Sequence, residues 1–364
     1  MDASQLDFNN HFRSEGGLFI PPVKQLGEMI KHTIKGYYSR MHEYRDIHPR
    51  FPSVNINYID NTLLNAVASK KNDKYYIGIY AGTFILLNEL FLRMMSSPNI
   101  LTEIGDSSKE EPTKKLFNPQ QFDLNIYDLC KPDNDNVMPK DPTRQLYASL
   151  FTKAALNFLF DHEYAHIAFG HVDYLVSSRN IFSMEEKEVV KVAPLNYQTL
   201  EMDADCFATH QGMLLLKKIN DSPLIVTEQR RPFFCGWENG MFNWLFAVYS
   251  LFRIFGYKNY KHAELLKYTH PPTGIRQRII SASVMDTLAD RLYAGITAKL
   301  IDINHEVIDK VENAFNEISE SKLNRDAINF AYTSEANQHI RLIISNWEIV
   351  KPKLAPYSFG TLER

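Results

Sequence analysis

Two histidines and a glutamate, in the run His162-Glu163-Tyr164-Ala165-His166, are the residues of this sequence with the clearest capacity for chemistry. Residues four apart on a helix lie on one face, so His162 and His166 can both direct a ring nitrogen at one metal ion. Glu163, next to that face, can reach a water molecule on the same ion. A zinc ion lowers the pKa of such a water, and a neighbouring carboxylate can take its proton during attack on a carbonyl group. The motif therefore predicts a nucleophile and its base in one site.

The surroundings of this motif are apolar. Residues 143–169 have helical periodicity, and residues 154–169 are apolar on nearly every side, which is typical of a buried helix. Asp161 and the three motif residues interrupt this apolar surface. Because burying such groups without a partner costs several kcal/mol, a bound metal is the simplest explanation of their presence.

A hydrolytic zinc site usually has three protein ligands and one open position. Glu201 and Asp205 lie four residues apart on an apolar helix predicted over residues 199–217, so their carboxylates share one face. We predict Glu201 as the third ligand and Asp205 as the carboxylate that orients a ligand histidine from behind. A solvated acidic helix start is the other interpretation of these residues. Asp203 and His171 stay open as alternative ligands.

A third polar element lies further along the chain. His270 precedes the rigid pair Pro271-Pro272, and Arg276 follows six residues after the histidine. His270 could donate a hydrogen bond to a developing oxyanion, with Arg276 adding positive charge nearby. Taken alone, the pattern fits an exposed His-Pro turn better than a catalytic role.

The remaining pattern predicts an α+β fold that is mainly α. Four further stretches have apolar residues at helical spacing: residues 22–44, 83–95, 240–255 and 299–318. Period-two alternation at 54–58 and an apolar run at 75–80, separated by a polar turn at 69–74, predict a small antiparallel sheet.

The chain divides into three predicted regions. These are an N-terminal helical segment (1–50), a central domain that carries the motifs (51–285) and a C-terminal helical region (286–364). Residues 97–142 and 176–196 are polar or rich in proline, so we predict them as long surface insertions beside the metal helices. Loops in that position could form a lid or an exosite.

Composition limits the classes of partner. The 40 basic and 43 acidic residues give a net charge of −3, so no broad positive field favours nucleic acid. The three cysteines, Cys130, Cys206 and Cys235, lie far apart and suit a reducing compartment. No secretory signal is recognisable, and no apolar stretch reaches the roughly 20 residues that span a bilayer. We therefore expect a cytoplasmic protein without membrane insertion.

Taken in order, the motifs His-Glu-x-x-His, Glu-x-x-x-Asp and His-Pro followed by arginine resemble the gluzincin metallopeptidases, specifically the HtpX and CAAX prenyl protease group. The stretch 65–68 followed by 76–82 is similar to that group's strand pair beside the cleft. The resemblance covers about residues 54–280 and implies a zincin-like (minigluzincin) catalytic core with an active-site helix and a C-terminal helical extension. Those families are embedded in membranes, whereas this sequence has no spanning stretch, which puts membrane or prenylated substrates in doubt.

This resemblance implies one Zn²⁺ ion and a role for each matching residue. His162, His166 and Glu201 would bind the ion, and Glu163 would be the base. Asp205 would hold a ligand histidine. The residues that would contact substrate or the tetrahedral intermediate are Asn65, His270 and Arg276.

The apolar motif helix and the helical C-terminal extension are also similar to the Lit-type phage-exclusion peptidases, bacterial zinc enzymes that cleave elongation factor Tu when a phage component triggers them. This implies a soluble endopeptidase acting on a protein or peptide substrate. One alternative is a catalytically silent binding or sensor module, but a structural zinc site has no use for Glu163 and normally has four protein ligands. A deformylase-like amidohydrolase would want an upstream cysteine ligand, and Cys130 lies in a polar, Asp-rich stretch.

Overall fold

The computed structural model describes residues 1–111, 137–180, 192–255, 262–291, 297–319 and 325–362. The strands are β1 (Val54–Ile59), β2 (Ala66–Lys71) and β3 (Lys74–Tyr80). The helices of the N-terminal half are α1 (Ala3–His11), α2 (Lys24–Ile47), α3 (Ala81–Ser96), α5 (Pro142–Ala168) and α6 (His171–Asn180). Those that follow are α7 (Pro194–Asp221), α8 (Arg231–Phe234), α9 (Trp237–Ile254), α10 (Thr273–Arg291), α11 (Thr297–Ile318), α12 (Asp326–Ala331) and α13 (Ser334–Leu354). The prediction of a mainly helical α+β fold is confirmed.

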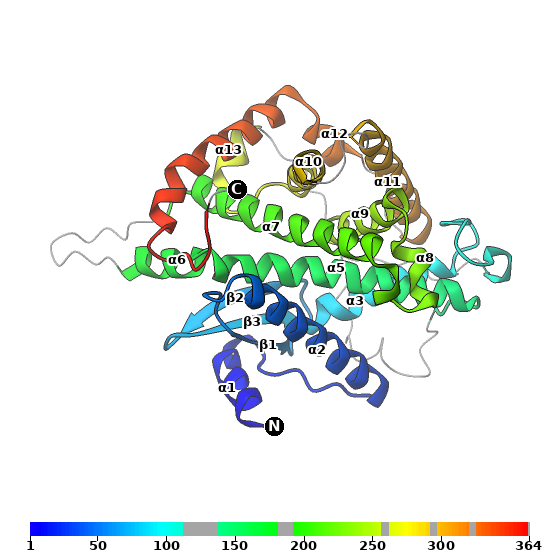
Figure 1. Ribbon diagram of the computed structural model, residues 1–364, viewed down its shortest axis with the longest axis horizontal. Coiled ribbons are helices and arrows are strands. Elements are labelled where there is room, and N and C mark those ends of the chain that lie inside the picture. Colours follow the sequence, from blue (N-terminus) through cyan, green and yellow to red (C-terminus); the bar gives the residue numbers. More distant parts are fainter. Residues whose placement is uncertain (112–136, 181–191, 256–261, 292–296, 320–324, 363–364) are drawn as a thin grey trace.

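Helix α5 occupies the middle of the molecule, as its apolar circumference predicts. The sheet lies on one side of it with α1 and α2, and helices α7, α9, α10, α11 and α13 lie on the other (Figure 1). Its start is fixed by Asp141, whose side chain accepts hydrogen bonds from the backbone N–H groups of Thr143 and Arg144. Because α5 packs against α3, α7, α9 and β2, the side chains of its motif meet elements from both sides.

The sheet is mixed, so the prediction of a purely antiparallel sheet is wrong. Its order is β1-β3-β2, with β1 parallel to β3 and β2 antiparallel to β3. The residues predicted as a turn, 69–74, are mostly strand, and the turn itself is only Asn72 and Asp73, which both have positive φ. Strand β2 is a half-buried edge strand with small and polar side chains. Its sequence therefore lacks the period-two apolar alternation that would have predicted it. Its position leaves one strand edge free.

The predicted insertion at 97–142 begins with a folded turn. Ile100 and Leu101 are buried, and the fully buried guanidinium of Arg144 lies among the backbone carbonyls of this segment. It donates hydrogen bonds of 2.7–2.9 Å to the carbonyl oxygens of Met95, Ser97, Ile100, Leu101 and Ile104. Residues 112–136 lie outside the described residues, as do residues 181–191 of the second predicted insertion. The rest of that insertion, 176–180 and 194–196, continues α6 and starts α7.

Arg144→Met is expected to lower the free energy of unfolding by about 3–5 kcal/mol, because five buried carbonyl groups would lose their donor at once. Urea titration followed by circular dichroism measures this change. Arg50→Met, at an exposed arginine, is the matched control and should stay within about 0.5 kcal/mol of wild type. Equal midpoints for the two variants would contradict the assigned role of Arg144.

Residues 355–362, which we call the tail segment, pack against the end of α5. The backbone N–H of Phe359 donates to the carbonyl oxygen of Ala168 at 3.0 Å, and the Phe359 ring meets Tyr75 of β3 edge to face. Gly170, which ends α5 with φ +76°, lies so close to Tyr357 that an added Cβ would sit 2.6 Å from its backbone. The tail segment thus fixes the turn between α5 and α6.

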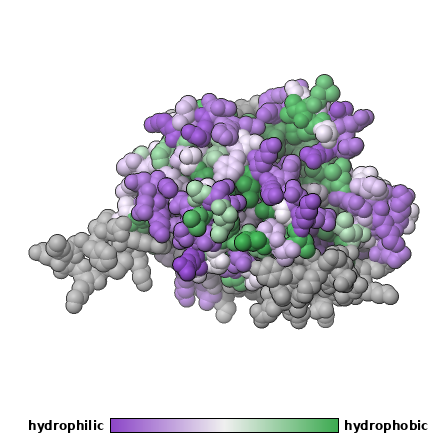
Figure 2. Space-filling model, turned by 90° about the horizontal axis from the view of Figure 1, so that it is seen from below, coloured by the Kyte–Doolittle hydropathy of each residue, from purple (hydrophilic) through white to green (hydrophobic). Residues whose placement is uncertain are grey.

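The face seen from below is mixed: hydrophilic side chains alternate with apolar areas over its described part (Figure 2). Among the described helices, none is long and apolar enough to cross a membrane.

Candidate metal and active site

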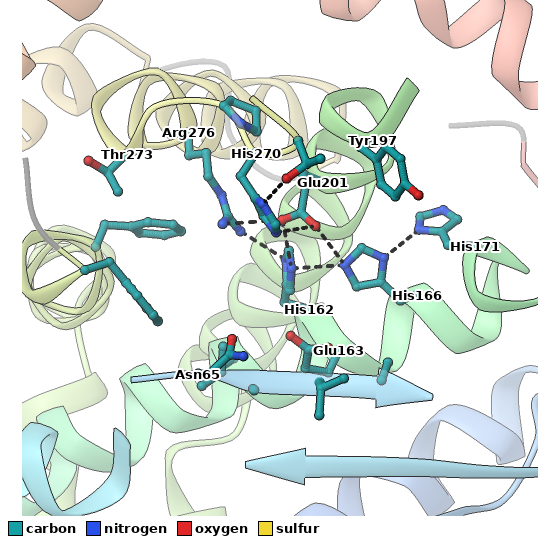
Figure 3. A pocket seen from close by; sticks show the side chains of 18 of the residues that line it. Asn65, His162, Glu163, His166, His171, Tyr197, Glu201, His270, Thr273 and Arg276 are labelled. Atoms are coloured by element: carbon teal, nitrogen blue, oxygen red, sulfur yellow. Dashed lines mark hydrogen bonds and ion pairs between the residues drawn. The ribbon is translucent and has the colours of Figure 1, made fainter. Parts of the chain in front are cut away.

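Helices α5 and α7 bring together the three predicted ligands. The Nε2 atoms of His162 and His166 lie 3.1 Å apart, and they are 3.4 and 3.5 Å from the carboxylate oxygens of Glu201 (Figure 3). One ligand atom from each residue falls within 4.8 Å of the others. Zinc bonds to nitrogen and oxygen ligands are about 2.0–2.2 Å long, so three atoms at this spacing can share one ion. The donor set of two imidazoles and one carboxylate fits zinc chemistry.

The alternative ligands are engaged elsewhere. His171 Nε2 lies 3.1 Å from Asp203 Oδ2, and His171 Nδ1 lies 3.0 Å from His166 Nδ1, the ring nitrogen that faces away from Glu201. Asp203 and His171 therefore stand behind His166 rather than beside the ligand atoms. This arrangement favours Glu201 over either of them as the third ligand.

Behind His162 stands a carboxylate with its own partner. Asp205 Oδ1 lies 2.9 Å from His162 Nδ1, and both Asp205 oxygens accept hydrogen bonds from Arg276, at 2.8 and 2.7 Å. Burial alone would raise the pKa of Asp205, but the charge and hydrogen bonds of Arg276 lower it. An ionised Asp205 accepts the Nδ1 proton of His162 and leaves Nε2 free for a metal.

The three predicted ligands differ in how far their pKa values favour the form that binds a metal. Burial lowers the pKa of His166 well below its ordinary value, so its ring is neutral. For His162, burial is outweighed by its hydrogen bonds to Asp205 and Glu201, which raise the pKa to about 10. Metal binding at His162 must therefore displace a proton. The charge of Arg276 overcomes the effect of burial on Glu201 and holds its pKa well below the usual range.

Glu163 faces the free edge of the sheet. Its carboxylate accepts a hydrogen bond from the backbone N–H of Ala68 in β2, and burial raises its pKa to about 7. In the register of β2 with β3, Asn65 accepts from the Tyr80 N–H at 3.0 Å, so the alternate residues Ala66 and Ala68 point their backbone groups away from β3. The base thus lies against the edge of β2 that β3 does not occupy, and it uses the Ala68 N–H of that edge.

These residues line a cleft of about 510 Å³. Residues 64–68 form one wall, and the other comes from α9, α10 and the residues before α10, including Thr269, His270 and Pro271. Apolar side chains line part of the cleft: Phe158, Leu159, Leu251, Phe252 and Phe255. A cleft with one strand wall and one helical wall suits an extended chain.

The residues predicted to contact substrate have different surroundings. His270 is 64% exposed, with Nε2 3.5 Å from Glu201, so it reaches the metal site from the open side. Asn65 is exposed at the start of the strand wall, and its backbone is held by Thr83. The guanidinium of Arg276 is largely occupied by Asp205 and lies 3.4 Å from Glu201. Arg276 therefore supports His162 through Asp205 and lies beside the predicted ligand Glu201.

Asp161 has a different explanation from the one its position in an apolar helix suggests. Its carboxylate accepts hydrogen bonds from both Arg40 and Tyr44 of α2, with the Tyr44 hydroxyl at 2.5 Å. The prediction that a metal accounts for this residue is wrong. Asp161 fastens α2 to α5 directly before the motif.

Sequence reasoning missed how the first turn of α6 joins the two sides of the site. Asp173 accepts hydrogen bonds from Lys70 and Tyr75 of the β2–β3 hairpin, both at 2.7 Å. Two residues earlier, His171 contacts the ligand His166. The available sign of this turn in the sequence was Gly170, a glycine that ends one helix directly before His171.

This geometry can be set beside known proteins. Residues 110–290 match the profile of the Peptidase U49 family. The match supports a peptidase. The Peptidase U49 span contains the motif helix, Glu201, Asp205, His270 and Arg276, and it excludes the strands and Asn65. Neither the curated proteins nor the solved structures gave a match. The zincin-like core and the likeness to the HtpX and CAAX group stay predictions.

Proposed function

We propose that this protein is a zinc-dependent endopeptidase that hydrolyses a peptide bond in an intracellular protein. The observation that carries the proposal is the convergence of His162, His166 and Glu201 within 4.8 Å, with Glu163 directly beside them. The Peptidase U49 match supports the peptidase chemistry. We further propose a Lit-like role in phage defence or regulation, because that family contains the Lit-type proteases.

A bound zinc ion would polarise both the attacking water and the scissile carbonyl. Glu163 accepts a proton from the water as the water oxygen attacks the carbonyl carbon. Glu163 then passes that proton to the leaving nitrogen. His270, on the open side of the site, can donate a hydrogen bond to the oxygen that becomes negative. Asp205 and Arg276 hold His162 in place during these steps.

The strand wall suggests how substrate would bind. The backbone groups of Ala66 and the carbonyl of Ala68 do not pair with β3, and an extended peptide can add to such an edge through main-chain hydrogen bonds. A peptide bound there would lie between β2 and the helical wall, with a carbonyl near the ligand atoms. Main-chain binding needs no free end of the substrate, which suits an endopeptidase.

A catalytically silent binding module is the second candidate. The glutamate at position 163 argues against it, because a structural zinc site needs no base. Metal analysis of protein purified without chelator, combined with the cleavage assay below, separates the two, since a silent module would contain no zinc or would hold it without turnover.

The test of the proposed function is a comparison of lysates. Lysate incubated with the wild-type protein should gain new peptide ends, mapped by mass spectrometry, and lysate incubated with Glu163→Gln should not. Glu348→Gln, at an exposed glutamate of α13, is the matched control and should cleave like wild type. A chelator should abolish the new ends. If the same ends arose with the Glu163→Gln variant, the proposed chemistry would be wrong.

The rate should also depend on pH. Because Glu163 must be deprotonated to act as the base, kcat/KM falls as the pH drops below its pKa, which burial raises to about 7. A bound dication would lower this pKa, so the fall is expected to begin at pH 7 or below and to approach about tenfold per pH unit. A pH series on the mapped substrate measures it, with circular dichroism to verify folding. A flat profile down to pH 4 would contradict the assignment of Glu163 as a base with a raised pKa.

A further inference from the structure

Behind the metal-facing side of His166 lies a second histidine with its own carboxylate. His166 Nδ1 is 3.0 Å from His171 Nδ1, and His171 Nε2 is 3.1 Å from Asp203 Oδ2. His171 is completely buried and Asp203 is 4% exposed, so solvent is nearly absent from both contacts. Buried polar contacts at these distances constrain the rings that make them.

The facing nitrogens of the two rings allow one arrangement of protons when Nε2 of His166 binds a metal. His166 must then carry its proton on Nδ1 and donate it to His171 Nδ1. His171 accepts there and carries its own proton on Nε2, which it donates to the Asp203 carboxylate. Each ring has one tautomer and one orientation, and each hydrogen bond has one donor.

We propose that His171, oriented by Asp203, is the positioning residue that fixes the tautomer and ring orientation of His166 and thereby sets how tightly the site holds its metal. The inference rests on the proposed zinc site. The two predicted ligand histidines are held differently: His162 bonds directly to the carboxylate of Asp205, whereas the ring of His171 stands between His166 and Asp203. Helix α7 thus carries one ligand and the carboxylates that serve both histidines.

The main chain builds the place of His171. Gly170 ends α5 in the left-handed region, and α6 begins at His171 itself. The backbone of Tyr357 in the tail segment closes over Gly170. Since His171 presents Nδ1 to His166 and Nε2 to Asp203, both of its nitrogens are used, and it serves the site as a hydrogen-bond partner rather than as a ligand.

The zinc dissociation constant tests this proposal, measured by competition with a chromophoric chelator. His171→Leu removes the acceptor and is expected to weaken zinc binding by about 10–100-fold. His171→Asn keeps an oxygen near the position of Nδ1 and should recover part of that loss. Asp203→Leu should weaken binding as His171→Leu does. The visible spectrum of the Co²⁺-substituted protein should shift in both leucine variants, because the His166 ligand changes its geometry.

His339→Leu is the matched control. His339 is also a buried histidine, and its Nε2 lies 2.6 Å from the amide oxygen of Gln198 in α7, which is not a predicted ligand. This variant should lose stability and keep the zinc affinity and Co²⁺ spectrum of wild type. If His171→Leu does not fold, the comparison of His171→Asn and Asp203→Asn with wild type decides, since both should still weaken zinc binding.

The outcomes distinguish this inference from the proposed function. Wild-type protein that binds no zinc would overturn both. Wild-type protein that binds zinc and cleaves, with unchanged affinity and spectrum in the His171 and Asp203 variants, would overturn only the positioning role.

Discussion

Glu163→Gln is expected to bind zinc as tightly as wild type and to cleave its substrate about 10²–10⁴-fold more slowly, the usual contribution of a general base. The amide has nearly the shape of the carboxylate, so the contact with the Ala68 N–H can persist through the amide oxygen. It cannot accept a proton from water. Zinc content by atomic absorption and single-turnover rates on the mapped substrate give the two quantities separately.

Two results would contradict this expectation. Wild-type rates in Glu163→Gln would place the base elsewhere. Loss of zinc from the variant would mean that Glu163 helps to hold the ion. Glu348→Gln, made and purified in parallel, controls for any general effect of replacing a glutamate by its amide.

Glu201→Ala is expected to have the largest effect on metal content. It removes one of three ligands, and the loss should exceed the roughly 100-fold upper range for residues that only support a ligand. It also removes an acidic partner of Arg276, whose Nη1 lies 3.4 Å from Glu201, and leaves a buried positive charge less well balanced. Isothermal titration with zinc and the unfolding midpoint of the metal-free protein measure both effects.

The choice of ligand depends on this variant. Retention of one tightly bound zinc in Glu201→Ala would favour the ligands that the sequence left open, Asp203 or His171. Asp203→Ala in the same assay is the comparison. It should weaken zinc binding less than Glu201→Ala, because Asp203 contacts His171, which lies between it and His166.

The sequence made part of the site predictable because that part is local. His162, Glu163 and His166 share one helical turn, and Glu201 and Asp205 share another, so the helical repeat alone places each set on one face. The apolar surroundings of the first set identified the buried helix that carries it. The helical repeat does not show that the two helices pack together. In the structure, α5 packs directly against α7.

The rest depends on contacts between distant parts of the chain, for which spacing gives no signal. The sequence position of Asp161, directly before the motif, suggested that a metal explains its burial. Its partners Arg40 and Tyr44 belong to another helix. The sheet is mixed because β3 lies between β1 and β2. The alternation of apolar residues within β1 or β3 does not indicate which strand is central. The spacing of the sequence likewise gives no sign of the role of Arg144, because its carbonyl partners lie 40 to 49 residues earlier.

The tail segment gives the protein an order of assembly during synthesis. Helix α5, with its histidines and glutamate, leaves the ribosome long before residues 355–362, whose backbone closes the turn that holds His171 against His166. A nascent chain therefore contains His162, Glu163 and His166 before it contains the tail segment that supports them. If this is the proposed zinc site, its full affinity for the ion therefore depends on a segment that is synthesised after every residue that would bind the ion.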